Sequence, residues 1–271
     1  MTERVRIERQ GGVARVILAR PDKHNGMDLA MLDAVRGAAR ELRGDRQLRT
    51  VILAGDGPSF CAGLDVKAVF GNRAAMLAAA AALSSPIRNR FQDWSMAWRE
   101  LGVPVIAAIH GNCFGAGLQL ALGADVRIAT PGAQLSIMEA KWGLVPDMGG
   151  PTLLRELVRI DVAKELAMTG RVLDGKAAQA LGLVTHLADD PLAAAQTLAA
   201  EIATRSPDAI AAAKHLLQET WHASERSALS AERRWQRRVL MGDNQRIAIR
   251  RNSDRRDDNK QPAPWQPRRF R

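Results

Sequence analysis

Cysteine is scarce in this chain of 271 residues, and no cysteines or histidines stand at the spacing of a metal site. Its two cysteines, Cys61 and Cys113, lie in apolar, glycine-rich surroundings, which favours buried reduced thiols over a disulfide. Since a CxxC motif and a His/Cys cluster are both missing, we expect no zinc or other metal site.

Long hydrophobic runs are missing as well. The longest run, residues 76–83, is rich in alanine and far too short to span a bilayer. The first residues alternate charged and apolar side chains like an edge strand and contain no apolar signal core. We therefore expect a cytoplasmic protein without a membrane segment, long enough to bury a substantial core.

Acidic residues are outnumbered by basic ones, which gives a formal net charge of +10. Residues 246–271 carry nine Lys and Arg against three Asp. A terminal charge run is typical of a solvated tail or a subunit contact. A nucleic-acid partner is the alternative, but the segment offers only Trp265 and Phe270 for stacking on bases.

Residues 104–130 form the most informative stretch. Their pattern predicts a buried strand, a glycine-rich turn, a short helix and a second strand, at residues 105–109, 115–117, 117–122 and 125–129. The turn contains no serine or lysine nucleophile, and Leu120 stands where a dinucleotide-binding motif needs its third glycine. Because Gly115 and Gly117 permit close backbone approach, we expect free amides here to stabilise negative charge.

Strands and helices alternate through the first half of the chain, and helices dominate after Pro151. We expect further strands at 4–9, 13–20, 49–54, 134–138 and 183–187. We expect helices after the cap residue Asp28, within 73–100 with a break at 84–86, and at 152–158, 162–168, 175–181, 192–203, 207–219 and 225–241. This order predicts an α/β protein, with a core over residues 1–200 and a helical region with an Arg-rich tail over 201–271.

Three segments together resemble the crotonase superfamily, the enoyl-CoA hydratase/isomerase group. They are SFCAGLD at 59–65, GNCFGAGLQLA at 111–121 and MEAKWGLVPDMGG at 138–150, and the loop RPDKHN at 20–25 is similar to the N-terminal loop of that group. The resemblance implies a ββα superhelix with two roughly perpendicular sheets. It also implies C-terminal helices that make a homotrimer, often paired into a hexamer.

The shared chemistry of that superfamily is stabilisation of a thioester enolate by two backbone amides, an oxyanion hole. By resemblance, those amides are Leu64 and Ala116. Coenzyme A enters as part of the acyl-CoA substrate, and no separate cofactor is expected. The resemblance places the substrate and its coenzyme A along Lys23, His24, Asn25, Cys61, Ala62, Gly63, Asp65, Gly115 and Gly117.

The acid–base residues depart from the hydratase pattern. Hydratases of this group carry two glutamates; the second matches Glu139, but the first is replaced by Gln119, which cannot exchange a proton. Asp147 matches the second acid of the dienoyl-CoA isomerase subgroup, although a helix N-cap or Asx turn would explain it equally well. The apolar neighbours of Glu139 favour its protonated form and suit acid–base work, and Gln119 is left to orient substrate or water.

These patterns favour double-bond isomerisation of an enoyl- or dienoyl-CoA by Glu139, with Asp147 as partner acid. Hydration of a 2-enoyl-CoA is the second possibility. An RNA-binding protein on the same scaffold, suggested by the basic tail, and an acyl-CoA-binding protein without catalysis are the remaining alternatives.

Overall fold

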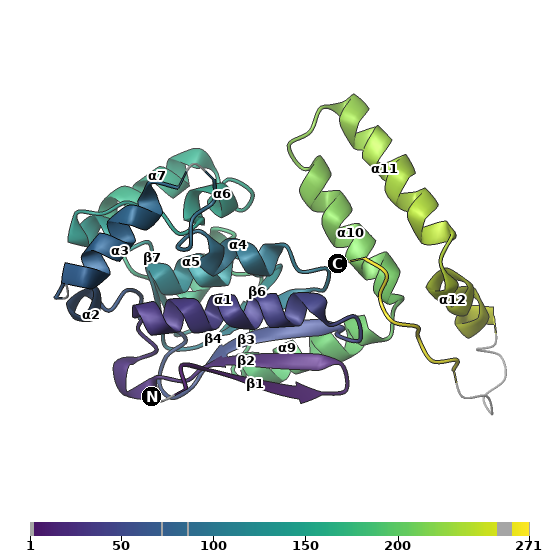
Figure 1. Cartoon of the computed structure of the whole chain (residues 1–271), viewed down its shortest axis with the longest axis horizontal. Coiled ribbons are helices and arrows are strands. Elements are labelled where there is room, and N and C mark those ends of the chain that lie inside the picture. Colours follow the sequence, from purple (N-terminus) through teal and green to yellow (C-terminus); the bar gives the residue numbers. More distant parts are fainter. Residues whose placement is uncertain (1–2, 72, 86, 254–261, 271) are drawn as a thin grey trace.

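The computed structural model of the chain describes residues 3–71, 73–85, 87–253 and 262–270 (Figure 1). Its largest sheet has the strand order β1-β2-β3-β4-β6-β9, in which β1 and β2 are antiparallel and the other neighbours are parallel. These strands are Val5–Gln10, Val13–Leu18, Thr50–Gly55, Val105–Ile109, Val126–Ala129 and His186–Leu187. A second sheet has the order β5-β7-β8, at Asn112–Phe114, Gln134–Ser136 and Leu173–Asp174. The predicted α/β class with two sheets is confirmed.

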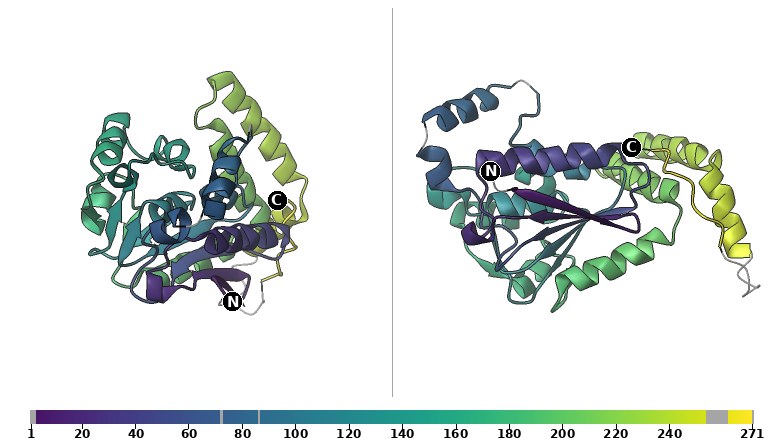
Figure 2. Two further views of the ribbon diagram at one scale, coloured as in Figure 1. Left: turned by 60° about the vertical axis from the view of Figure 1, so that its left-hand side comes forward. Right: turned by 60° about the horizontal axis from the view of Figure 1, so that its bottom comes forward.

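Helices cover both faces of the large sheet (Figure 2). On one face lies α1 (Leu29–Gly44), which begins where the Asp28 side chain accepts a hydrogen bond from the Met31 amide at 2.7 Å. On the other face lies α9 (Pro191–Ala203), packed on Ile52, Ile106 and Ile128. Alternate residues of β3 and β4 enter the main core instead, so both faces of these strands are buried. This explains why their sequences are continuous apolar runs.

At two places the chain passes directly from a strand of the large sheet to a strand of the second sheet. The strand β4 is followed almost at once by β5, and β6 by β7. The turn between β4 and β5 requires Gly111, because its φ is +55° and an added Cβ would lie 2.0 Å from the carbonyl oxygen of Pro58. This tight turn places β5 beside residues 58–61, where Cys61 and Cys113 form a parallel bridge.

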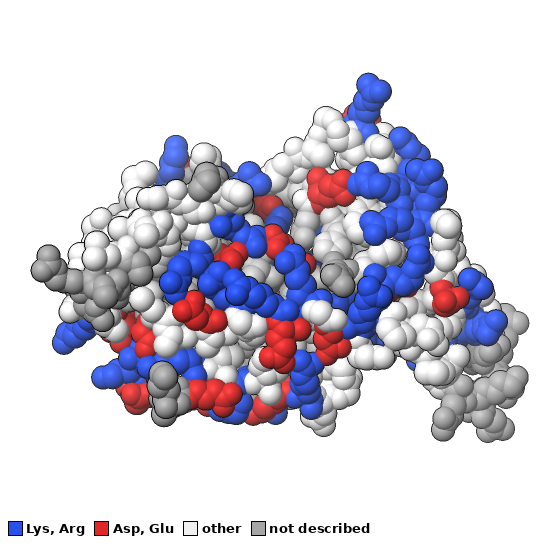
Figure 3. All heavy atoms as spheres, viewed as in Figure 1, with Lys and Arg blue, Asp and Glu red and all other residues white. Residues whose placement is uncertain are grey.

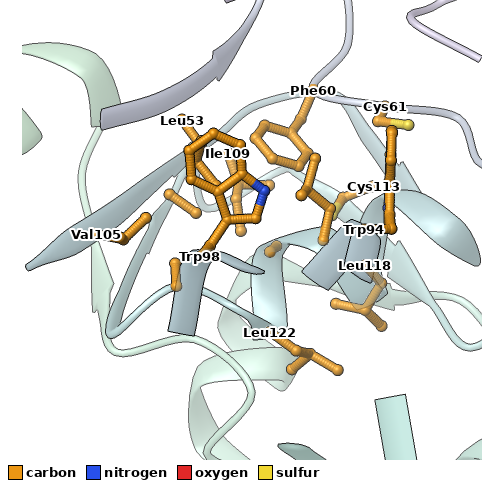
Figure 4. Packing of buried hydrophobic residues seen from close by; sticks show 14 of the residues in the cluster. Leu53, Phe60, Cys61, Trp94, Trp98, Val105, Ile109, Cys113, Leu118 and Leu122 are labelled. Carbon is orange, nitrogen blue, oxygen red and sulfur yellow. The ribbon is translucent and has the colours of Figure 1, made fainter. Parts of the chain in front are cut away.

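The core contains further helices besides α1 and α9. They are α2 (Val66–Phe70), α3 (Arg73–Leu83), α4 (Asp93–Arg99), α5 (Ala116–Leu122), α6 (Gly150–Leu154), α7 (Ile160–Thr169) and α8 (Gly175–Ala180), with short 3-10 turns η1 (Pro21–Lys23) and η2 (Glu139–Trp142). Trp94 and Trp98 of α4 are fully buried among Phe60, Ile109 and Leu118 (Figure 4). This aromatic cluster fixes α4 against the strand–turn–helix segment around residue 115.

Three C-terminal helices, α10 (Pro207–Thr220), α11 (Glu225–Leu240) and α12 (Asp243–Ser253), extend beside the core (Figure 1). Lys214 anchors α10, since its buried ammonium donates to the Val103 carbonyl at 2.9 Å and to the Asp125 carboxylate at 2.7 Å. Exposed Arg side chains gather along α11 (Figure 3). Among the described helices, none is long and apolar enough to cross a bilayer.

The basic C-terminal segment is only partly a solvated tail. Arg268 is buried and donates to the carbonyls of Leu48 and Asp45, so the chain returns to the core after α12. Phe270 is buried, and Trp265 lies under the guanidinium of Arg251 at 4.5 Å. Phe270 thus packs inside the protein and Trp265 is half-buried, and residues 254–261 lie outside the described part.

Several predicted boundaries are wrong. The helix expected at 152–158 is α6 at Gly150–Leu154, and only His186–Leu187 of the strand expected at 183–187 forms a strand. The strand expected at 134–138 ends at Ser136, and the 3-10 turn η2 begins at Glu139. The sequence did not predict β5, α2 or α12.

Candidate active site

The loop of residues 59–65 is held between two other segments. On one side the Ala62 amide donates to the His24 carbonyl at 2.9 Å, and the Met27 amide donates to the Gly63 carbonyl at 2.8 Å. On the other side the Phe114 amide donates to the Cys61 carbonyl at 3.0 Å. Main-chain hydrogen bonds therefore join the segment 59–65 to the N-terminal loop on one side and to the segment 111–121 on the other.

Two glycines allow the loop to approach α5 closely. A Cβ on Gly117 would lie 2.2 Å from the Cys61 carbonyl oxygen, and a Cβ on Gly63 (φ +94°) would lie 2.7 Å from the Phe114 carbonyl oxygen. The same Cβ on Gly63 would be 3.7 Å from the Ala116 nitrogen, so the residue before Leu64 lies next to the first turn of α5. Among the described residues, the amides of Leu64 and Ala116 donate to no backbone carbonyl.

A cavity of about 370 Å³ opens beside these two amides. Leu64 and Ala116 line it on one side, and the segment from Met138 to Met148 lines it on the other. Apart from the indole of Trp142, the polar side chains in its described lining are those of Gln119, Glu139 and Asp147. The structure therefore brings the three predicted catalytic residues, and the two residues whose amides are predicted to form the oxyanion hole, to one cavity.

Gln119 is buried and its carboxamide is held on both sides. Its Nε2 donates to Glu139 Oε1 at 2.6 Å, and its Oε1 accepts from the amides of Met148 and Gly150, each at 2.9 Å. A carboxamide neither gains nor loses a proton at neutral pH, so Gln119 contributes by holding its neighbours in place. It orients Glu139 and fixes the backbone on either side of Gly149.

Glu139 is the deeply placed acid of the cavity. Its residue is only 8 % exposed, and its Oε2 is buried without a hydrogen-bond partner. Burial raises the pKa of Glu139, and the nearby Asp147 carboxylate adds to the rise, whereas the hydrogen bond from Gln119 opposes it. A carboxyl group with a raised pKa is better suited to accept and return a proton than an ordinary surface carboxyl group.

Asp147 lies at the mouth of the same cavity. It does not cap the following helix, because the N-cap residue of α6 is Gly149 and no side chain caps that end. The helix-cap explanation of Asp147 is therefore wrong. The protein around its carboxylate raises the pKa of Asp147 by desolvation, although the residue is exposed overall.

The raised pKa of Glu139 predicts an unusual pH dependence of stability. Because the folded chain holds this proton more tightly than the unfolded chain, Glu139 lowers the free energy of unfolding progressively as pH rises from about 4 through its raised pKa. Glu139→Gln should therefore gain stability relative to the native chain between mildly acidic and mildly alkaline pH, as measured by urea denaturation. The substitution Glu165→Gln, at an exposed glutamate, should give no such gain in the free energy of unfolding. An equal gain in both variants would contradict the raised pKa of Glu139.

The residues expected to contact coenzyme A fall into two groups. The exposed side chains of Lys23 and His24 stand at the outer end of the loop, next to Ala62. Asn25 and Cys61 instead have fully buried side chains that bond within the protein, Asn25 to the Ser59 carbonyl at 2.8 Å and Cys61 to the Asn25 carbonyl at 3.1 Å. Their side chains support the loop, so any contact of Asn25 and Cys61 with coenzyme A stays a prediction that concerns their backbone.

The other predicted binding positions shape the loop and the start of α5. Asp65 caps α2 by accepting from the Ala68 amide at 3.1 Å and pairs with Arg20 at 2.9 Å. Gly115 begins α5 at φ +48°, and a Cβ there would lie 3.4 Å from Glu139 Oε1. Gly115 is favoured by its positive φ, since a Cβ there would make only an ordinary contact with the carboxyl group, whereas Gly63 and Gly117 make room for the loop.

The apolar walls of the cavity were missed by the sequence analysis. They come from Met27, from α3 (Met76, Ala80 and Leu83), and from Phe91 and Phe114. A usable signal did exist, because α3 is apolar on nearly every face and such a helix must be buried or bind something apolar.

Comparison with known proteins agrees with this geometry. A family model described as enoyl-CoA hydratase/isomerase matches residues 8–260. A probable enoyl-CoA hydratase of Mycobacterium tuberculosis is 35% identical over 77% of this chain and 78% of its own length. An enoyl-CoA hydratase structure from Bacillus anthracis is 26% identical with a TM-score of 0.86, covering 97% of this chain and 98% of that chain.

A second solved structure contains coenzyme A. It is described as an enoyl-CoA hydratase of Thermobifida fusca in complex with CoA, and it is 30% identical with a TM-score of 0.80 over 88% of this chain and 93% of its own. The chain therefore belongs to the enoyl-CoA hydratase/isomerase family, within the crotonase superfamily, as the three motifs predicted.

Proposed function

We propose that this chain is an acyl-CoA enzyme that shifts a double bond along the acyl chain. The amides of Leu64 and Ala116 would bind the thioester oxygen, and Glu139 would move the proton. The observation that carries the proposal is the buried, unpartnered Oε2 of Glu139 in the wall of a cavity that Leu64 and Ala116 also line. The related structure in complex with CoA supports a coenzyme A thioester as the ligand.

The reaction follows from the positions of these groups. The Glu139 carboxylate removes a proton from C2 of a 3-enoyl thioester, and the electron pair moves to the thioester oxygen. Two backbone N–H groups stabilise that charge, each by about 3 kcal/mol in comparable sites. The proton is then returned at C4, the thioester carbonyl re-forms, and the double bond lies between C2 and C3. Asp147 at the mouth is the second acid that would serve substrates with a more distant double bond.

The state of Gln119 favours this reaction over water addition. Hydration must place a hydroxyl group and a proton on adjacent carbons, and a second carboxyl group beside Glu139 makes that transfer easier to arrange. Here the neighbouring group is a carboxamide whose oxygen already accepts two backbone hydrogen bonds. Isomerisation needs only one group that takes and returns a proton.

Hydration of a 2-enoyl-CoA is the second candidate, and the names of the relatives favour it. Both the Mycobacterium tuberculosis protein and the Bacillus anthracis structure are called enoyl-CoA hydratases. In this reaction Glu139 alone would activate the water and supply the proton.

Incubation in D2O separates the two reactions. With 2-enoyl-, 3-enoyl- and dienoyl-CoAs, we expect the native chain to give isomers that carry deuterium at C2 or C4, detected by mass spectrometry. Gln119→Glu restores the second carboxyl group and should increase the share of 3-hydroxyacyl-CoA in the product. If the native chain yields mainly the 3-hydroxy product, hydration is its function; if it gives neither product nor exchange, it does not act on these substrates.

We further infer a homotrimer or a pair of trimers built through the C-terminal helices. Large apolar side chains remain exposed on all three of them, at Leu217, Trp221, Leu229, Leu240, Met241 and Ile249. Exposed apolar surface of this kind favours association between subunits.

A further inference from the structure

The cavity offers a substrate acyl group very few polar partners. Its described lining includes four methionines and two phenylalanines, and it contains no Lys, Arg, His, Ser, Thr or Asn. Two of its polar side chains are acids, Gln119 is bonded to Glu139 and to two backbone amides, and Trp142 offers a single indole N–H. A carboxylate on the acyl group would therefore lose its hydration without finding a cation in the described lining.

A negatively charged acyl group meets an additional penalty. Glu139 and Asp147 both line the cavity, and a third carboxylate would raise their pKa values further and be repelled by their charged forms. A cation that would offset this repulsion is absent from the described lining. The electrostatics of the wall thus exclude dicarboxylic acyl groups.

The apolar surface continues outward beyond the cavity. We call five of its lining residues the apolar rim, because their large apolar side chains remain exposed: Met76, Leu83, Trp142, Leu144 and Val145. Two come from α3 and three from the segment that follows Glu139, so the rim lies on two different chain segments of the mouth. Leu83 is 58% exposed and Val145 is 72% exposed, which leaves apolar area for a ligand to cover.

We infer that this site takes acyl-CoAs with an uncharged hydrocarbon chain long enough to leave the cavity and cover the apolar rim. This inference rests on the proposed function in one respect, namely that the acyl group of an acyl-CoA enters this cavity. The rim is continuous with the cavity wall, and an acyl chain that fills the cavity meets the rim next. An extended hydrocarbon chain suits both surfaces, because most of the side chains that line them are apolar.

Affinity should therefore rise with chain length. Each methylene group removed from water contributes about a fourfold gain in affinity. Saturated butanoyl-, octanoyl- and dodecanoyl-CoA have no double bond to move, so isothermal titration with them measures binding apart from turnover. We expect affinity to increase through the series, and glutaryl-CoA to bind at least tenfold more weakly than pentanoyl-CoA, which has the same number of acyl carbons.

Two leucines of α3 provide a matched pair of variants. Leu83 belongs to the apolar rim, whereas Leu77, which is 72% exposed on the same helix, is not part of the cavity lining. Leu83→Ser should lower the ratio of dodecanoyl-CoA to butanoyl-CoA affinity by about fivefold to tenfold, and Leu77→Ser should leave that ratio unchanged. Thermal melting of both variants checks that they remain folded.

Each other outcome overturns the inference. Equal affinity for butanoyl- and dodecanoyl-CoA would show that the rim does not bind the acyl chain, even if enoyl-CoAs are turned over normally. Tighter binding of glutaryl-CoA than of pentanoyl-CoA would show that a cation reaches the site. If Leu83→Ser changes the oligomeric state in sedimentation and leaves the affinity ratio unchanged, a second copy of the chain covers the rim. Conversely, length-dependent binding without turnover of any enoyl-CoA would overturn the proposed function and leave this inference standing.

Discussion

Glu139→Gln is expected to lower kcat on every enoyl-CoA substrate by about two to four orders of magnitude, which is the usual contribution of a general acid–base group. The substitution removes the exchangeable proton and keeps the size of the side chain. The glutamine at 139 can still accept the hydrogen bond from Gln119 Nε2, so the local geometry should survive. Steady-state assays with 3-enoyl-CoA, together with binding of a saturated acyl-CoA, separate lost chemistry from lost affinity.

Asp147→Asn is the matched control for this substitution. Asp147 lines the mouth of the cavity and is exposed, whereas Glu139 is buried beside Gln119. We expect the asparagine variant to lose less than tenfold in kcat with 3-enoyl-CoA. Full turnover by Glu139→Gln on all substrates would contradict the mechanism, and a larger loss at Asp147 than at Glu139 would exchange their roles.

Trp94→Ala should give the largest loss of stability, about 3–5 kcal/mol in the free energy of unfolding, because Trp94 is fully buried in the main core. The indole also has a second role, since its Nε1 donates to the Ala116 carbonyl at 2.7 Å. Removing it should displace the first residue of α5 and hence one of the two amides proposed to bind the thioester oxygen. Urea denaturation and kcat/KM measured on the same variant test both effects.

Trp94→Phe separates packing from the hydrogen bond. The phenyl ring retains much of the buried apolar surface but leaves the Ala116 carbonyl without its donor. We expect a smaller loss of stability, about 1–3 kcal/mol, accompanied by a clear loss of kcat/KM. If the phenylalanine variant is fully active, the indole donor does not position Ala116; if the alanine variant is as stable as the native chain, Trp94 is not part of the core.

The large sheet and its two covering helices were predictable because local signals agree there. The strands β3 and β4 are short apolar runs, and α1 begins at a good capping residue, Asp28. The strand β5 could not be predicted in this way, because Asn112–Phe114 mixes polar and apolar residues and becomes a strand only by pairing with β7. Its existence depends on a tertiary contact, which no local pattern encodes.

The site was predictable in its residues and not in its bonding. Motif resemblance selects Gln119 and Glu139, which are twenty residues apart in sequence, but the 2.6 Å bond between them depends on how α5 packs against η2. Motif resemblance also selected Asn25 for coenzyme A binding, although its side chain is buried and bonded to the Ser59 carbonyl. A motif marks positions that matter and does not distinguish those that support the site from those that reach the ligand.

The hydrogen bonds of Gln119 also bear on how this chemistry can change over generations. A glutamate at this position could still accept from the amides of Met148 and Gly150, so the backbone around Gly149 would keep its anchor. Only the donation to Glu139 would be replaced, by one proton shared between two carboxyl groups. Glutamine and glutamate codons differ by a single nucleotide. A protein lineage with this fold can therefore change between one-acid and two-acid chemistry by one substitution that keeps the backbone hydrogen bonds around Gly149.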